Sequence, residues 1–149
     1  MARTIKLVLL GFMPLAFGYA LNYAMLSWPL YGWKLNIISV ALLLLWGLLA
    51  YCAAAPGKSP AVQALLLCAA GIWMLLLVLC QDLVLGQYWT GIVGFSTQMY
   101  FLPLMSLRSG LSASVFHAPS ITVWLCCVIA WACMFAVSCL GCRLKQKRE

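Results

Sequence analysis

The stretch QDLVLGQYWTGIVGFSTQMYFLPLMSLRSG, residues 81–110, decides how the rest of the chain is interpreted. Between Asp82 and Arg108 it has 25 residues without a charge, which is long enough to cross a bilayer. It also contains three glycines, two glutamines and a proline, a combination that the other apolar runs lack. The stretch is therefore either a membrane span or a segment that folds back at the membrane edge, and this choice sets the topology.

Composition indicates a membrane protein. Hydrophobic residues make up 66% of the chain and charged residues only 7%, whereas soluble domains carry about 25% charged residues. At 149 residues we expect one polytopic membrane domain, residues 1–149, surrounded by the lipid bilayer. The net charge of +7 does not indicate a nucleic-acid partner, because the basic residues lie between apolar runs and at the two ends, where orientation signals belong.

Four apolar runs predict membrane-spanning helices, each with the roughly 20 residues that a span requires. The segment 56–60, Pro-Gly-Lys-Ser-Pro, predicts a tight turn and so an antiparallel hairpin of the second and third spans. The expected fold class is an all-α integral membrane protein, a four-transmembrane-helix bundle. Its predicted spans are residues 7–27, 35–55, 61–81 and 120–141.

The distribution of basic residues favours four spans over five. With four spans and the N-terminus inside, seven basic residues are cytoplasmic and two, Lys34 and Arg108, are outside. A fifth span over 83–105 changes the count to four inside and five outside, or five and four for the reversed protein, which is hardly a bias. We therefore expect a multi-pass protein of the plasma membrane or bacterial inner membrane with both termini cytoplasmic and a basic tail over 143–149. The seven inner residues are Arg3, Lys6, Lys58, Arg143, Lys145, Lys147 and Arg148.

Residues 83–105 then belong to the outer connection and predict a re-entrant or interfacial helix that ends at Pro103. Its polar and small residues recur at helical spacing, which predicts a stripe that packs on the bundle or lines a cavity. The stripe consists of Gln87, Thr90, Gly91, Gly94, Thr97 and Gln98, with Gly91 and Gly94 as packing positions. We expect the other flank to face lipid; it carries Tyr88, Trp89, Ile92, Val93, Phe95, Met99 and Tyr100. An ordinary fifth span is the alternative.

The N-terminal segment imitates a signal peptide, because Arg3 and Lys6 precede an apolar run. Removal of this segment as a signal peptide is one alternative. The apolar run continues to Leu26, however, which is longer than the apolar region of a signal peptide, so we expect the segment to remain as the first span. Small residues recur there at every fourth position and predict a ridge for close helix packing, although alanine richness alone would give the same pattern. The ridge consists of Ala16, Ala20 and Ala24.

The eight cysteines predict packing and neither a disulfide framework nor a metal site. Seven lie within the predicted spans and Cys142 lies at the inner boundary, so no extracellular pairs are available. Cys139 and Cys142 form an isolated C-x-x-C, a weak signal that also admits acylation. The single histidine, His117, is in the outer connection, so we expect no metal and no cofactor.

Candidate functional residues cluster in the outer connection. Asp82 is the only acid besides Glu149, and an ionisable group at membrane depth is a functional candidate. A solvated helix end, or an ion pair with Arg108, is the alternative. Ser112 or Ser114 with a histidine and Asp82 would imitate a hydrolase triad, but no G-x-S-x-G motif accompanies them, so no catalytic residue is assigned. The candidates are Asp82, Gln87, Gln98, Arg108 and His117.

Three classes of function remain open. The first, favoured by the packing residues and scarce charge, is a non-enzymatic accessory or assembly subunit of a membrane complex. The second is a small oligomeric transporter or channel that uses the broken outer segment around Asp82. The third is a membrane-embedded enzyme acting on lipid or peptide. The expected partners are other membrane subunits or further copies of the chain. A foreign partner would favour the accessory role, whereas a homo-oligomer would favour transport.

Overall fold

The computed structural model describes residues 2–28, 33–55, 57–87, 91–105 and 123–148, and this part of the chain is helical with short connections. The expectation of an all-α fold is confirmed. The elements are α1 (Ala2–Leu10), α2 (Met13–Ser27), α3 (Trp33–Ala53), α4 (Pro60–Leu67), α5 (Ala69–Leu79), the π-helical turn η1 (Cys80–Val84), α6 (Ile92–Phe101), the 3-10 turn η2 (Leu102–Leu104) and α8 (Val123–Arg148).

Three helical stretches are long and apolar enough to cross a membrane: Thr4–Ser27, which joins α1 and α2, then α3, and then α8. A fourth is possible if α4 and the helix that follows it, which bend by 56° relative to each other, form one broken span. Helix α6 has ten residues, about 15 Å of helix, against a hydrocarbon core of about 30 Å. The described residues of 83–105 therefore do not form the ordinary fifth span that was the alternative.

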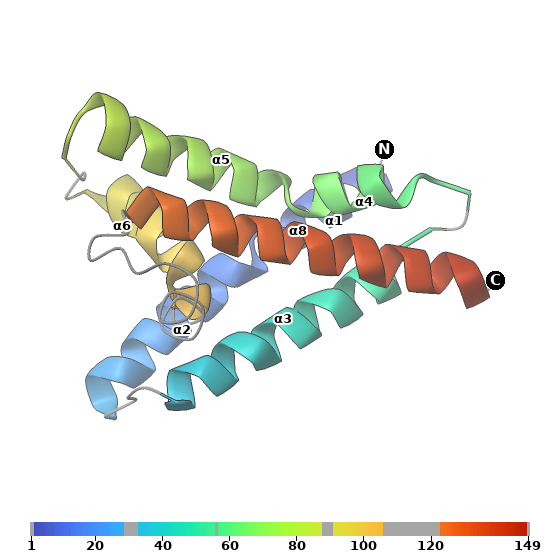
Figure 1. The fold of residues 1–149 in the computed structure, drawn as a ribbon, viewed down its shortest axis with the longest axis horizontal. Coiled ribbons are helices and arrows are strands. Elements are labelled where there is room, and N and C mark those ends of the chain that lie inside the picture. The colour runs from blue at the N-terminus through green and yellow to red at the C-terminus, as the bar shows by residue number, and fades with distance from the viewer. Residues whose placement is uncertain (1, 29–32, 56, 88–90, 106–122, 149) are drawn as a thin grey trace.

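The two chain ends lie at the same end of the molecule, beside the connection from α3 to α4 (Figure 1). The end of α2, the start of α3 and the end of α5 lie at the opposite end (Figure 1). Helix α8 continues to Arg148, so the described residues of the expected basic tail over 143–149 extend the last helix. No proline or glycine follows Gly141, and lysine and arginine are stabilising in the last turn of a helix.

Helix α8 packs against both α3 and α4, whereas α3 and α4 make little direct contact (Figure 1). The second and third predicted spans are therefore joined by a tight turn but do not pack as a hairpin pair. Glycines explain the preference for α8: a Cβ atom on Gly141 would lie 2.5 Å from the carbonyl oxygen of Gly47. Glycine at both positions allows the backbones of α3 and α8 to approach this closely, because glycine has no side chain.

The turn between α3 and α4 is held by one buried glutamine. The Gln63 side chain accepts a hydrogen bond from the backbone N–H of Ala55 at 2.6 Å. Its amide group donates to the carbonyl oxygens of Ala55 and Lys58, both at 3.1 Å. Gly57 supplies the positive φ of +74° that the turn requires. One side chain thus satisfies backbone groups that the end of α3 leaves unpaired.

Two helix breaks face each other inside the bundle. The first separates α1 from α2, where Pro14 cannot donate to the helical ladder. The second lies at Cys68, between α4 and α5. A Cβ atom on Gly11 would lie 2.5 Å from the carbonyl oxygen of Leu67, so the breaks are in direct contact. Tyr100 of α6 donates a hydrogen bond at 3.0 Å to the carbonyl oxygen of Gly11, a buried backbone group at the first break.

Candidate functional site

Asp82 lies in the π-helical turn η1 at the end of α5. The backbone N–H of Leu85 donates to the carbonyl oxygen of Cys80 at 3.1 Å, five residues earlier, and not to the carbonyl four residues earlier as in an α-helix. The extra residue in this turn changes the direction of the side chains that follow. Such turns are rare and occur often at functional sites.

The surroundings of Asp82 are polar but only partly paired. Its Oδ2 atom is buried and has no hydrogen-bond partner among the described residues. Its neighbour Gln81 is completely buried, and the side-chain amide donates to the Thr97 hydroxyl of α6 at 3.5 Å. Thr97 donates in turn to the carbonyl oxygen of Gly94 at 2.7 Å. The Gln81 side chain therefore joins η1 to α6 immediately before this acid in the sequence.

The other candidate residues either have exposed side chains or lie outside the described residues. Gln87 and Gln98 are exposed. Arg108 and His117 lie outside the described residues, as do Ser112 and Ser114. Gln81 and Thr97 are buried partners that the candidate set lacked, although Thr97 belonged to the predicted stripe.

The predicted stripe over 87–98 is wrong as one continuous helical face. Helix α6 begins at Ile92, so Gln87 and Gly91 precede it, and a Cβ atom on Gly91 would meet nothing within 4 Å. Within α6 the buried small and polar positions are Gly94 and Thr97, one turn apart. Gln98 points away from this face and is exposed, since successive residues of a helix are about 100° apart.

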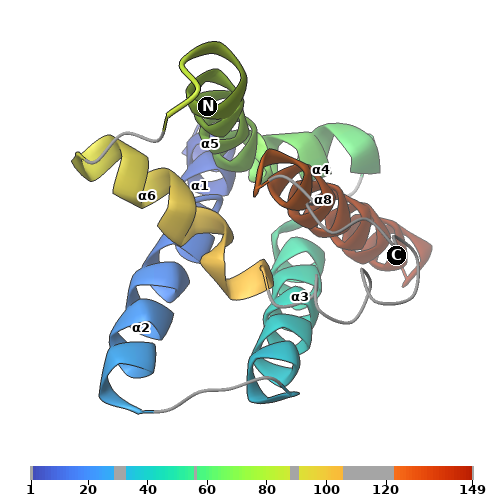
Figure 2. The ribbon, with the colours of Figure 1, turned by 60° about the vertical axis from the view of Figure 1, so that its left-hand side comes forward.

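The expectation that Met99 and Tyr100 face lipid is also wrong. Met99 is 5% exposed and Tyr100 is completely buried, because the last turn of α6 packs between α2 and α5 (Figure 2). Burial raises the pKa of the Tyr100 phenol above its ordinary value, so the group stays a neutral donor to Gly11. Ile92, Val93 and Phe95 are exposed, as the predicted lipid-facing flank requires.

The ridge of Ala16, Ala20 and Ala24 does not pack within the chain. Ala16 and Ala20 are exposed and Ala24 is only partly buried. Helix α2 instead packs through Gly18, where a Cβ atom would overlap the Met99 carbonyl group of α6. The reason is register: Gly18 is two residues from Ala16 and so lies on the other side of the helix.

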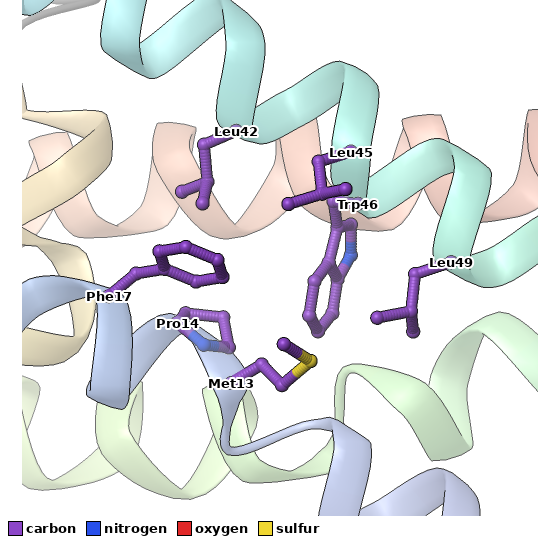
Figure 3. A pocket seen from close by; sticks show the side chains of 7 residues that line it. All are labelled: Met13, Pro14, Phe17, Leu42, Leu45, Trp46 and Leu49. Carbon is purple, nitrogen blue, oxygen red and sulfur yellow. The ribbon is translucent and has the colours of Figure 1, made fainter.

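An apolar groove separates α2 from α3 and is the second candidate surface. At one end the two helices close against each other, where the Trp46 ring points toward Met13 and Pro14 (Figure 3). The space left there is about 10 Å³, no more than one water molecule could occupy. Next to it, toward the end of α2 and the start of α3, the two helices leave an open groove of about 370 Å³. We call it the α2–α3 groove; it is lined by Phe17, Ala20, Leu21, Ala24, Ile38, Ala41, Leu42, Leu45 and Pro103.

Asp82 is the acid of this region and follows Gln81, whose side chain contacts the Thr97 hydroxyl. A carboxylate and a hydroxyl are ligands that hard cations accept, although a full metal site requires more oxygen ligands. Among the described residues no three His, Cys, Asp or Glu side chains come together. The Oδ2 atom of Asp82, unpaired among the described residues, can accept a hydrogen bond or contact a single cation.

Together, fold and site define an all-helical protein with at least three helices suited to crossing a membrane. Neither a protein-family model, nor a curated protein, nor a solved structure matches the chain.

Proposed function

We propose that the chain is a multi-pass membrane protein that acts by helix packing, as an accessory or assembly subunit of a membrane complex. The α2–α3 groove carries this proposal, because it is an open apolar surface between two neighbouring spans. In the proposed arrangement a membrane helix of the partner protein lies in the groove. Small residues on both walls, Ala20 on α2 and Ala41 on α3, allow a helix backbone to approach closely.

The interior of the bundle supports a structural role. Its buried hydroxyl, phenol and indole groups connect the chain's own helices: Trp46 donates to Ser138, Ser39 donates to the carbonyl oxygen of Pro103, and Tyr100 donates to that of Gly11. Each bond joins segments at least 64 residues apart in sequence. Polar groups used in this way fix one packing arrangement, which suits a scaffold that presents a groove.

The proposed topology has four spans and cytoplasmic termini in a plasma membrane or bacterial inner membrane. The shared end of the molecule in Figure 1 supports it, because Lys58 and the four basic residues of α8 lie near the two termini. Lys34 lies at the opposite end, at the start of α3. In this topology α4, α5 and η1 form one broken span, and α6 is a re-entrant helix entering from the outer side.

Purification of the tagged chain in mild detergent tests the proposed role. We expect one foreign membrane protein to co-purify at a fixed stoichiometry. Ala20→Phe fills the groove and should abolish co-purification of this partner protein. Val40→Phe, at an exposed position of α3 that does not line the groove, should leave co-purification unchanged. A homo-oligomer without a foreign partner, or equal retention by both variants, would contradict the proposal.

A second candidate function, an oligomeric ion-coupled transporter, is favoured by the buried Oδ2 atom of Asp82. A carboxylate that binds a transported cation needs an oxygen that structural contacts do not occupy. In this candidate the path passes Asp82 and Thr97, and the ion is a small cation.

Folded yield and ion uptake, measured in parallel for Asp82→Asn, Arg108→Gln and the double variant, test this second candidate. Normal yield with lost uptake in Asp82→Asn supports an ion site. Yield that falls in both single variants and recovers in the double variant identifies a structural pair, since an unpaired buried charge costs about 3–5 kcal/mol. Normal yield and uptake in all three variants would show that Asp82 is not a site residue. The transport candidate would then lose most of its support.

A further inference from the structure

A second groove runs along the other side of α3, beside its crossing with α8. Its volume is about 430 Å³, within the roughly 300–1,000 Å³ of sites that bind small molecules. Leu44 and Leu48 form one wall and Leu140 and Leu144 form the other. The groove exists because the glycine crossing brings the two helix backbones together while the leucines on both sides project outward. We call it the α3–α8 groove.

One end of the α3–α8 groove is basic. Arg148 lines it directly and is exposed. One turn earlier, the Lys145 ammonium lies 5.4 Å from the ring centroid of Tyr51, which also lines the groove. Of the chain's two acids, Asp82 lies at the other end of the bundle and Glu149 lies outside the described residues.

We propose that the α3–α8 groove binds one anionic phospholipid of the cytoplasmic leaflet, with an acyl chain between the leucine walls and the phosphate at Arg148. Charge complementarity selects the anionic headgroup, since basic sites between membrane helices on the cytoplasmic side bind such lipids. The inference depends on the membrane topology proposed above but not on the accessory role.

The basic end of the groove, together with its length, indicates a lipid as its occupant. From Val137 to Arg148, α8 rises by about 16 Å, which is close to half of a hydrocarbon core of about 30 Å. An acyl chain occupies one leaflet and ends at its headgroup, where a basic side chain can contact the phosphate. The groove matches one leaflet and ends where the charges begin, so it fits a lipid.

Native mass spectrometry of the full-length purified chain, with dioleoyl phosphatidylglycerol and dioleoyl phosphatidylcholine as probes, tests this site. We expect one phosphatidylglycerol to bind more tightly than phosphatidylcholine. Arg148→Gln should weaken its binding about fivefold, the effect of one basic residue near an anionic membrane surface. Arg143→Gln is the matched control, because Arg143 is exposed on the same helix but does not line the groove and lies about 140° around the helix.

The acyl-chain part of the proposal has its own pair of variants on α3. Leu44→Trp fills the groove and should also lower phosphatidylglycerol binding, whereas Ile37→Trp, at a comparably exposed position outside the groove, should not. Equal binding of the two lipids, equal loss in the two arginine variants, or no loss in Leu44→Trp would each overturn the proposal. Competition by soluble glycerol 3-phosphate at millimolar concentration, with Leu44→Trp unaffected, would identify a phosphate site and would likewise overturn it.

Discussion

Trp46 of α3 donates its indole N–H to the Ser138 hydroxyl of α8 at 2.8 Å, and both side chains are almost completely buried. Ser138 donates in turn to the carbonyl oxygen of Met134 at 2.7 Å, so its oxygen is both donor and acceptor. This chain of hydrogen bonds joins residues 92 positions apart and fixes the rotation of α3 relative to α8.

Ser138→Ala should lower the free energy of unfolding by about 1–2 kcal/mol, because it leaves the buried indole N–H without an acceptor. The measurement is denaturation in mixed detergent micelles, performed also for Trp46→Phe and for the double variant. The two substitutions should be coupled, with the double variant less destabilised than the sum of the single ones. Additive effects would show that the hydrogen bond contributes nothing.

Gly141→Ala should destabilise the chain, although alanine favours a helix over glycine by about 1 kcal/mol. The added Cβ atom would lie 2.5 Å from the Gly47 carbonyl oxygen and 3.1 Å from the Tyr51 nitrogen, both backbone atoms that cannot move alone. The thermal midpoint in detergent should fall, while that of Leu140→Ala on the exposed side of α8 should change little. A higher midpoint for Gly141→Ala would contradict the close crossing.

The sequence was sufficient to predict the helices that cross the bundle, because a run of about 20 apolar residues has few other stable structures. It was not sufficient to predict which helices pack together. The turn over 56–60 predicts neighbours in the chain, but α8 contacts α3 more closely than α4 does, through a glycine pair 94 residues apart. The sequence around Gly47 does not predict that this residue packs against Gly141.

The candidate site was predictable only in part for the same reason. Asp82 is conspicuous because acids are scarce in this chain, but its surroundings depend on a π-helical turn. That turn changes the register between residues 80 and 92, so the spacing that seemed to place Gln87 and Gly94 on one face was not maintained. Burial of Thr97 depends on where α6 begins, and the N-cap residue there, Gly91, makes no side-chain capping hydrogen bond.

Gly94→Leu should lower folded yield more than Ile92→Leu does. Gly94 is buried where α6 meets the bundle, whereas Ile92 is 85% exposed two residues earlier. The larger side chain at 94 must displace α6 from its neighbours, a change that costs about 1–3 kcal/mol in packed interiors. Size-exclusion chromatography of the two variants measures the difference, and equal yields would contradict the packing of this face.

Reporter fusions test the proposed topology. Fusions after Lys34, Gly57, Arg108 and Glu149 should report outside, inside, outside and inside, since the basic residues then lie mostly in the cytoplasm. An outside C-terminus would contradict the four-span arrangement and would require another crossing between η1 and α8.

Photo-crosslinking in the native membrane tests the central claim most directly. A photoreactive amino acid at Ala41 faces the α2–α3 groove, while the same residue at the adjacent Val40, which is 49% exposed, lies outside it. If a partner helix occupies the groove, Ala41 should give one discrete adduct with a foreign membrane protein, and Val40 should give little or none. The same adduct from both positions, or adducts at Ala41 only with lipid or a second copy of the chain, would contradict the account.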